Sequence, residues 1–237
     1  KGRTVATPLG QAVWLDLRHL GAATIHERLP LITEVAKTFA GVDPVVAPIP
    51  VRPAVHYTMG GILCNGQTET PLKGLYAAGE CSSVGIHGAN RLGSNSLAEI
   101  VVFGRVAGER AAQYAKAVPA GKSEAVRRQA DAVEARLLAL LGQEKGERVA
   151  KLRDEMHEAM ETGVGIFRKA DGMKTACDKL AVLRDRYRRG LKLDDRNRAF
   201  NTEWLSAIEL GFTLEIAEVI AQSALHRKES RGAHTRL

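Results

Sequence analysis

The sequence predicts a mixed α/β region that is followed by an all-α region. Before Pro119, short apolar or extended stretches alternate with helical stretches and with loops rich in glycine and proline. After Pro119, the composition changes to long, charged stretches in which apolar residues recur at helical spacing. With 237 residues, of which 45% are hydrophobic, the chain is large enough to bury a core in one large domain or two small ones.

The first elements are a strand and an interrupted helix. The stretch "QAVWLDL", residues 11–17, predicts a short strand. Residues 20–41 predict a helical stretch that is interrupted near Pro30 and closed by Gly41. Four prolines between positions 44 and 53 then exclude a helix and favour an extended connection, which we expect to join two domains.

The extended connection leads to His56 and Tyr57, which are followed by Gly60 and Gly61. Because glycine has no Cβ atom, this pair would let the backbone approach a flat ligand closely. His56 therefore has two interpretations, a ligand-binding side chain or a buried histidine that satisfies its own hydrogen bonds.

A strand, a loop and a helix come next. The apolar run "GLYAAGE", residues 74–80, predicts a buried strand that leads into a loop. Ser96 and Glu99 have the spacing of a capping box, so a helix should begin near Ser96 and continue to about Val118. This helix is apolar on nearly every side, which predicts that it is buried. Its Gly104-x-x-x-Gly108 spacing predicts close packing against another helix.

The second half of the chain predicts an antiparallel helical bundle, because it contains four long, charged stretches in which apolar residues recur at helical spacing. The stretches are residues 123–141, 144–161, 174–189 and 202–227. A basic cluster lies between Arg184 and Lys192, and it fits a solvated helix face or an interface with another subunit. Although the formal net charge is +7, no recognised nucleic-acid-binding module accompanies these cations, so we expect no nucleic-acid partner.

Several other classes are excluded by composition. The apolar runs, such as Ile100 to Phe103, are far shorter than the roughly 20 residues that a membrane span needs, and no leader-like segment opens the sequence. The three cysteines are widely spaced without a CxxC pair, which argues against a disulfide framework and against a cysteine-built metal site. We therefore expect no metal site, no direct membrane span and a reducing, cytoplasmic setting.

The loop before Ser96 is a candidate anion site. Unpaired backbone N–H groups and the positive end of the helix dipole face such a loop, and they would stabilise a cofactor that becomes negative during reaction, such as a reduced flavin. An ordinary strand-to-helix turn is the alternative. Arg91 adds a planar, permanently charged group that suits a carboxylate or a phosphate, unless it forms an ion pair with Glu80 or Glu99. Together with His56, it would suit a small dicarboxylate, with one cation at each end.

Five blocks of the sequence closely resemble the flavoprotein subunit of fumarate reductase and succinate dehydrogenase. They are "LDLRHLG" at 15–21, "VHYTMGGI" at 55–62, "GLYAAGECSSVGIHGANRLGSNSLAEIVVFGRVAGERAA" at 74–112, "GVGIFR" at 163–168 and "FNTEWLSAIELGFTLEIAEVIAQSALHRKESRGAHTRL" at 200–237. The blocks stand in the family's order and cover essentially the whole chain. "HYTMGGI" and "ANRLGSNSLAE" resemble the quinol:fumarate reductase branch more than the succinate dehydrogenase branch.

The resemblance implies roles for five residues. His56 and Arg91 match the family's ligands for the substrate carboxylates. Glu80 matches the glutamate that hydrogen-bonds FAD, and Ser96 and Leu97 match the helix-start positions that contact its isoalloxazine end. In this family, hydride passes between flavin N5 and one alkene carbon of fumarate, while an arginine supplies a proton to the other carbon.

The resemblance also implies a domain organisation. Residues 1–53 correspond to the C-terminal part of the capping, or substrate, domain, residues 54–115 to the second segment of a Rossmann-like FAD-binding domain, and residues 116–237 to the helical C-terminal domain. The dinucleotide fingerprint, the histidine that attaches FAD covalently, the proton-donating arginine and a further substrate histidine belong to a region before Lys1. We therefore expect a C-terminal fragment that is inactive by itself.

The implied activity is interconversion of fumarate and succinate by the full-length subunit, with fumarate reductase preferred. Electrons would be exchanged with an iron-sulfur subunit and with quinone, and membrane anchor subunits would hold the complex on the cytoplasmic side of the inner membrane. The alternatives are succinate dehydrogenase in the oxidative direction, a flavoenzyme similar to L-aspartate oxidase, and a non-catalytic helical interaction module.

Overall fold

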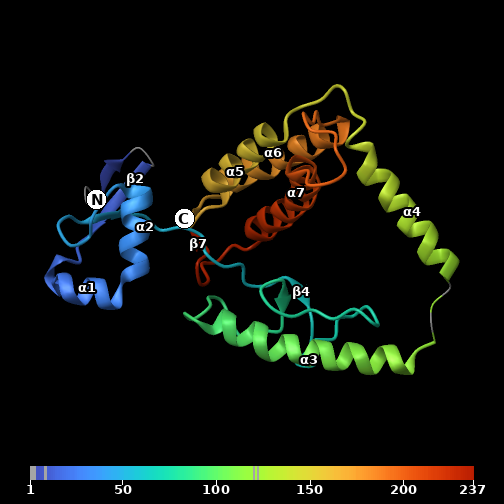
Figure 1. Cartoon of the computed structure of the whole chain (residues 1–237), viewed down its shortest axis with the longest axis horizontal. Helices are drawn as coiled ribbons and strands as arrows, with labels where there is room; N and C mark the ends of the chain where they lie inside the picture. Colours follow the sequence, from blue (N-terminus) through green and yellow to red (C-terminus); the bar gives the residue numbers. More distant parts are fainter. Residues whose placement is uncertain (1–3, 8–9, 120, 122) are drawn as a thin grey trace. The chain divides into compact units, whose positions relative to one another are not determined.

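The computed structural model describes residues 4–7, 10–119, 121 and 123–237. The chain forms two compact units, which comprise residues 1–54 and 55–237. Figure 1 shows short strands with two helices in the first unit, and long helices in the second. Short strands alternate with helices before Pro119 and long helices dominate after it, which is the mixed α/β region followed by an all-α region that the sequence predicts. The domain boundaries at 53/54 and 115/116 stay predictions.

The first unit contains a three-stranded antiparallel sheet. Its strands are β1 (Val5–Thr7), β2 (Gly10–Leu15) and β3 (Ile49–Val51), in the order β1-β2-β3. The strand predicted at 11–17 is therefore confirmed as the central strand of this sheet. The proline-rich connection contains no helix, and it contributes β3 to the edge of the sheet.

The interrupted helix is also confirmed. It consists of α1 (Ala22–Arg28) and α2 (Pro30–Ala40), which follow a short 3₁₀ turn. Proline is tolerated at the first position of α2 because its missing N–H would have no partner there. Gly41 ends α2 in the left-handed conformation, at φ +64°, which glycine adopts without strain.

The second unit begins with a two-stranded parallel sheet, β4 (Ile62–Leu63) and β5 (Ser82–Ser83). The buried strand predicted at 74–80 is wrong, since this segment forms turns and only Tyr76 makes an isolated bridge, to Glu69. The reason lies in its two glycines. Gly74 and Gly79 adopt φ values of +84° and +82°, which bend the chain out of the extended conformation.

Helix α3 (Asn95–Ala117) begins one residue before the predicted start, but its N-terminus is not a capping box. Ser94 is the N-cap residue, in the left-handed conformation and without a side-chain hydrogen bond to the helix. Glu99 is 1% exposed and does not reach back to the first turn. Its carboxylate is used instead by side chains from two other segments, so a tertiary network replaces the local cap that the spacing predicts.

The prediction that α3 is buried is wrong for this chain. Glu99 is its only buried residue, while Leu97, Val101 and Val102 are 67%, 71% and 55% exposed. In the part of the chain that the structure describes, no element covers these apolar side chains. Space is also open around Gly104 and Gly108, so the predicted close helix packing is absent among these residues.

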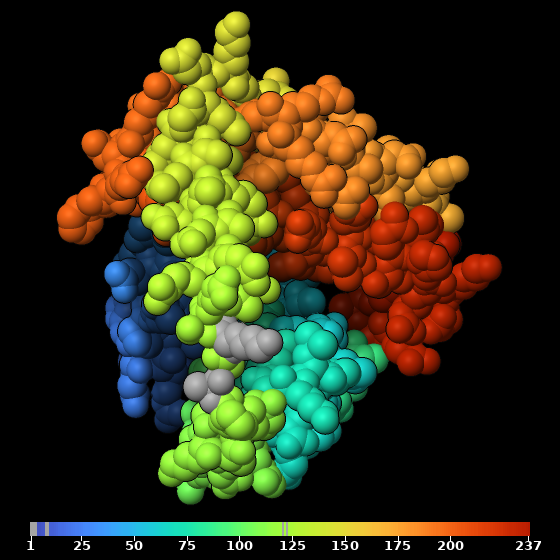
Figure 2. Space-filling view, turned by 90° about the vertical axis from the view of Figure 1, so that its right-hand side faces the viewer, coloured from blue at the N-terminus to red at the C-terminus, as the bar shows by residue number. Residues whose placement is uncertain are grey.

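The C-terminal half forms a helical bundle from three of the four predicted stretches, as α5 (Val149–Val164), α6 (Ala170–Arg189) and α7 (Thr202–His226). The stretch predicted at 123–141 also forms a helix, but it does not pack into the bundle as a fourth member. The three helices lie side by side in Figure 1. Helix α4 (Ser123–Ala139) has no buried residue, and Figure 2 shows its side chains at the surface. The core of the bundle includes Leu152, Met156, Met173, Leu180, Leu210 and Leu214.

Helices α5 and α6 approach each other closely because both carry a glycine at their contact. A Cβ atom at Gly163 would lie 2.6 Å from the carbonyl oxygen of Gly172 and 2.7 Å from the Cβ of Ala176. Helix α7 begins at a side-chain cap, since the buried Asn201 accepts a hydrogen bond of 2.7 Å from the backbone N–H of Trp204.

The basic cluster of α6 is not merely a solvated face. Arg186 donates hydrogen bonds to both Glu147 and Glu155, and Arg184 forms an ion pair with Glu218. These partners come from other helices or from the segment before α5, so the cations join elements of the bundle. The hydrogen bonds from Arg186 and then from Lys151 lower the pKa of Glu147 to about 2.

The chain ends at the bundle in a small parallel sheet of β6 (Phe167–Arg168) and β7 (Thr235–Arg236). None of the described helices combines the length and the apolar character that a membrane crossing requires.

Candidate functional site

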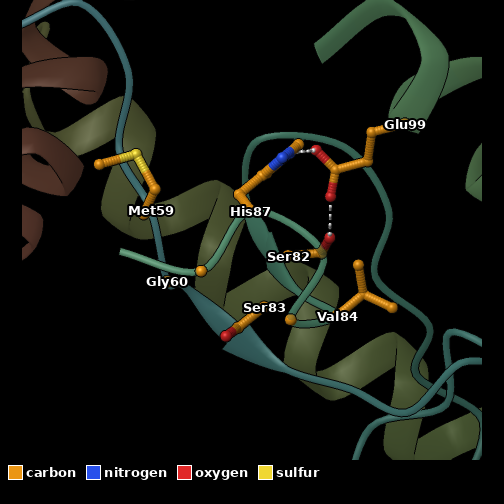
Figure 3. A pocket seen from close by; sticks show the side chains of 9 residues that line it. Met59, Gly60, Ser82, Ser83, Val84, His87 and Glu99 are labelled. Atoms are coloured by element: carbon orange, nitrogen blue, oxygen red, sulfur yellow. Dashed lines mark hydrogen bonds and ion pairs between the residues drawn. The ribbon is translucent and has the colours of Figure 1, made fainter. Parts of the chain in front are cut away.

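Three segments of the second unit converge around the side chain of Glu99: the extended chain after Val55, the loop after Gly79, and the first turns of α3. The Tyr57 hydroxyl donates a hydrogen bond of 2.8 Å to Glu99 Oε2, and His87 Nε2 lies 2.7 Å from the same oxygen. The Ser82 hydroxyl approaches the other oxygen, Oε1, at 3.4 Å. Figure 3 shows Ser82 and His87 pointing toward Glu99 from the loop.

The Glu99 carboxylate is ionised despite its burial. Burial opposes ionisation, but the hydrogen bonds from His87, Tyr57 and Ser82 outweigh it, so the pKa of Glu99 lies below its usual value. Burial, followed by the hydrogen bond to Glu99, raises the pKa of Tyr57. The hydroxyl therefore stays protonated and donates a hydrogen bond to Glu99. Because an ionised carboxylate only accepts hydrogen bonds, His87 Nε2 carries a hydrogen in this arrangement.

Arg91 lies beside this network and is half-buried. Its guanidinium carbon is 4.5 Å from the centre of the Tyr57 ring, and its Nη1 donates a hydrogen bond of 2.9 Å to the carbonyl oxygen of Leu92. Its Nε is buried without a partner. Among the ion pairs of the described residues, Arg91 has none with Glu80 or Glu99, so the structural ion pair considered as its alternative role is not found.

His56 and Glu80 are both exposed, and Glu80 is hydrogen-bonded to Thr58, two residues after His56. His56 immediately precedes Tyr57, so it shares the short segment whose ring supports Arg91. One carboxylate oxygen of Glu80 accepts a hydrogen bond of 2.9 Å from the backbone N–H of Thr58, which leaves its other oxygen available to a ligand. His56, Glu80 and Arg91 thus belong to one region of the second unit.

Ser96 and Leu97 occupy the first turn of α3. The Ser96 side chain is half-buried and lies close to the Tyr57 hydroxyl of the Glu99 network. Leu97 is 67% exposed and presents an apolar surface. Although the resemblance assigns Ser96 and Leu97 the same role, Ser96 faces the Glu99 network and Leu97 faces solvent.

Gly60 and Gly61 also have different surroundings. A Cβ atom at Gly61 would overlap the carbonyl oxygen of Cys81, which accepts a hydrogen bond of 2.8 Å from Ile62 N. Gly61 therefore permits a contact within the chain. A Cβ atom at Gly60 would meet only open space, so this position keeps room for a ligand.

A cavity of about 80 Å³ lies beside the buried network. It is large enough for a few water molecules and too small for a cofactor such as FAD. Its lining consists of Met59, Gly60, Ser82, Ser83, Val84, Gly85, His87, Gly88 and Glu99, and most of these side chains are drawn in Figure 3. In the part of the chain that the structure describes, no group of three or more His, Cys, Asp or Glu side chains is arranged to hold a metal ion.

The C-terminal segment contacts the loop that carries Arg91. A Cβ atom at Gly232 would overlap the carbonyl oxygen of Ala89, and Gly232 adopts φ +57°. The same segment is held to the bundle by Arg168, whose Nη1 lies 2.8 Å from the Nδ1 of the buried His234. Sequence reasoning gave no role to this segment, although its "ESRGAH" motif was part of the family resemblance.

Sequence reasoning also missed the network of Tyr57, His87 and Glu99. The available signal was the position of Tyr57 directly after His56. Glu99 was interpreted as part of a helix cap because its spacing from Ser96 is a local pattern, whereas its actual partners are 12 and 42 residues away.

These features define a site with an uncommitted cation, a buried acidic network and an exposed apolar helix start. Residues 2–97 match the family model described as FAD binding domain, and residues 153–237 match the one described as fumarate reductase flavoprotein C-term. The fumarate reductase flavoprotein subunit of Escherichia coli K12 is 57% identical over all 237 residues, which cover 39% of that subunit.

A solved structure of E. coli quinol fumarate reductase matches with a TM-score of 0.94 and 57% identity, over 100% of this chain and 40% of the other. The succinate dehydrogenase flavoprotein subunit of Coxiella burnetii is 42% identical, over 97% of this chain and 40% of that subunit. The chain belongs to the fumarate reductase and succinate dehydrogenase flavoprotein subunit family. It spans about 40% of the length of these relatives.

Proposed function

We propose that the chain is the C-terminal part of an FAD-dependent flavoprotein subunit that interconverts fumarate and succinate, with fumarate reduction as the preferred direction. The observation that carries this proposal is the state of Arg91. It is a half-buried cation with no carboxylate partner among the described residues, and it lies beside the segment of His56. A cation in this state has free donors for an anionic ligand.

The ligand would be a small dicarboxylate. Arg91 would bind one carboxylate group through its planar donors, and His56 would bind one through a ring nitrogen. The two side chains would thereby fix the substrate and leave the carbon atoms between its carboxylates exposed to reaction. A fixed positive charge at this place also stabilises the negative charge that develops on the substrate.

The residues fit FAD as well. Glu80 has a carboxylate oxygen free to accept a hydrogen bond from a hydroxyl group, Gly60 leaves open space, and the exposed Leu97 offers an apolar contact for a flat ring. Ser96 would lie at the same helix start. When bound, FAD supplies the hydride chemistry, and the protein supplies position and charge.

The partners are part of the proposal. The full-length subunit would exchange electrons with an iron-sulfur subunit and with quinone, and membrane anchor subunits would hold it peripherally on the cytoplasmic side of the inner membrane. The identity to the E. coli fumarate reductase subunit, 57%, exceeds the 42% identity to the C. burnetii succinate dehydrogenase subunit, which supports the reductive direction. We also propose that the 237-residue chain alone neither holds FAD tightly nor reduces fumarate.

The test is fumarate reduction by the full-length subunit that carries this sequence, with reduced viologen as electron donor. Arg91→Ala should lower kcat/KM by roughly 100-fold or more while FAD stays bound, because loss of the cation costs about 3 kcal/mol of binding to a charged group. The matched control is Arg105→Ala, since Arg105 is 81% exposed and pairs with Glu109 on the outside of α3.

Unchanged activity of the Arg91 variant would contradict the proposal and leave Arg91 with a structural role. A wild-type subunit that binds FAD but lacks fumarate activity would favour a different reaction for this site. If the 237-residue chain alone were yellow and active, the proposal that it is inactive by itself would be wrong.

A further inference from the structure

The position of the Arg91 guanidinium depends on very few contacts. An arginine side chain has many rotamers, so a ligand-binding arginine loses affinity unless the protein restricts it. Here the only direct hydrogen bond among the described residues is from Nη1 to the adjacent Leu92 carbonyl, which restrains one nitrogen. The face of the guanidinium lies over the Tyr57 ring, at 4.5 Å from its centre.

The Tyr57 ring is itself held at several points. Its hydroxyl donates to Glu99 at 2.8 Å and lies 3.3 Å from His87 Nε2. The ring of His87 packs edge-on against it, with 5.3 Å between the ring centres and 83° between the planes. The Glu99 anchor is 1% exposed, and it is restrained in turn by His87 and Ser82.

We propose that Tyr57 is a positioning residue, whose ring holds the Arg91 guanidinium for a substrate carboxylate and is fixed in turn by the buried Glu99 and by His87. The inference rests on the proposed function of Arg91 and adds how that residue is held in place. Tyr57 acts through Arg91 and does not contact the substrate.

An aromatic support suits this task better than an acidic one. The π-face of a tyrosine attracts a guanidinium electrostatically without occupying its N–H donors. A carboxylate at the same place would accept those donors and would compete with the substrate. The nearby acidic side chain, Glu99, accepts hydrogen bonds from the Tyr57 hydroxyl and the His87 ring N–H. Its negative charge therefore holds Tyr57 in place and does not pair with Arg91 directly.

The experiment compares variants of the full-length, FAD-loaded subunit. Tyr57→Leu removes the π-face and the hydroxyl, whereas Tyr57→Phe keeps the ring and removes only the hydroxyl, with its bond to Glu99 and its contact with His87. Fumarate KM and kcat are measured, together with the dissociation constant of malonate, a dicarboxylate without a reducible double bond, from the flavin absorbance. Tyr76→Leu is the matched control, because Tyr76 packs edge-on against Tyr114 away from the site.

We expect Tyr57→Leu to raise both the fumarate KM and the malonate dissociation constant about tenfold or more, and Tyr57→Phe to raise them about two- to fivefold. The change in kcat should be smaller. In an Arg91→Ala background, Tyr57→Leu should add little further loss, because the side chain through which it acts is already absent.

Wild-type values of KM and of malonate binding in Tyr57→Leu would overturn the inference, as would full additivity with Arg91→Ala. If Tyr57→Leu fails to fold or to bind FAD, Tyr57→Phe decides, and an unchanged KM in that variant overturns the inference. Failure of the wild-type subunit itself to bind malonate would contradict the proposed function, and with it this inference.

Discussion

The α5–α7 bundle and the region around α3 use their buried residues in opposite ways. In the bundle, apolar side chains such as Leu152, Leu180 and Leu214 are at most 1% exposed, and the charged groups pair at the periphery. In α3 the buried residue is the charged Glu99, while apolar residues such as Leu97 are exposed. The bundle is organised for stability, and the α3 region is organised to hold a few polar groups in fixed positions.

The largest expected effect is on core packing in the two regions. Leu180→Ala should destabilise the bundle by about 2–5 kcal/mol, because it removes a fully buried side chain and leaves a cavity. Leu97→Ala should change stability by less than about 0.5 kcal/mol, since Leu97 is 67% exposed. Urea unfolding of both variants, followed by circular dichroism, measures the difference. Equal effects would contradict the contrast between the regions.

The same glycine substitution should have opposite signs in the two regions. Gly163→Ala should destabilise the chain by about 1–3 kcal/mol, because its Cβ would be forced against Gly172 and Ala176. Gly104→Ala should be neutral or stabilising by up to about 1 kcal/mol, because space is open around it and alanine favours the helix. Thermal unfolding of both variants checks the sign. A stable Gly163→Ala variant would show that the helix contact is looser than described.

The smallest of these effects is the pH dependence that the bundle's ion pairs contribute. The pKa of Glu147 is depressed from 4.5 to about 2, chiefly by Arg186, so its contribution to stability is fully present above pH 4.5 and is lost as the pH falls toward 2. We expect about 1–2 kcal/mol, because the pair is only partly buried. Glu147→Gln should flatten the stability profile between pH 5 and pH 2, as measured by urea unfolding at each pH. An unaltered slope would assign the acid sensitivity to other carboxylates.

The sequence predicted best what depends on neighbours along the chain. The helices of the bundle, the break at Pro30 and the end of α2 at Gly41 follow from apolar spacing and from local backbone preference, and all are present. The predicted strand at 74–80 failed because two glycines with positive φ bend it, and the sequence does not reveal which glycines use that freedom. The predicted burial of α3 failed because burial depends on what covers a helix.

The candidate site was predictable only in part. The residue types of His56, Arg91 and Glu80 and the family resemblance selected them as ligands, and those roles stay predictions. The supporting network could not be predicted, because Tyr57 and Glu99 are 42 residues apart and the spacing of Glu99 from Ser96 favours a local cap. Tertiary hydrogen bonds to a buried carboxylate outweigh that local preference.

The central claim is that Arg91 is an uncommitted cation that binds one end of a dicarboxylate. The most direct measurement compares the dissociation constants of malonate and propionate, which both have three carbon atoms and differ by one carboxylate, in the FAD-loaded full-length subunit. The wild-type subunit should prefer malonate by roughly 100-fold or more, and Arg91→Ala should lose most of this preference. A preference that is unchanged by Arg91→Ala would contradict the claim.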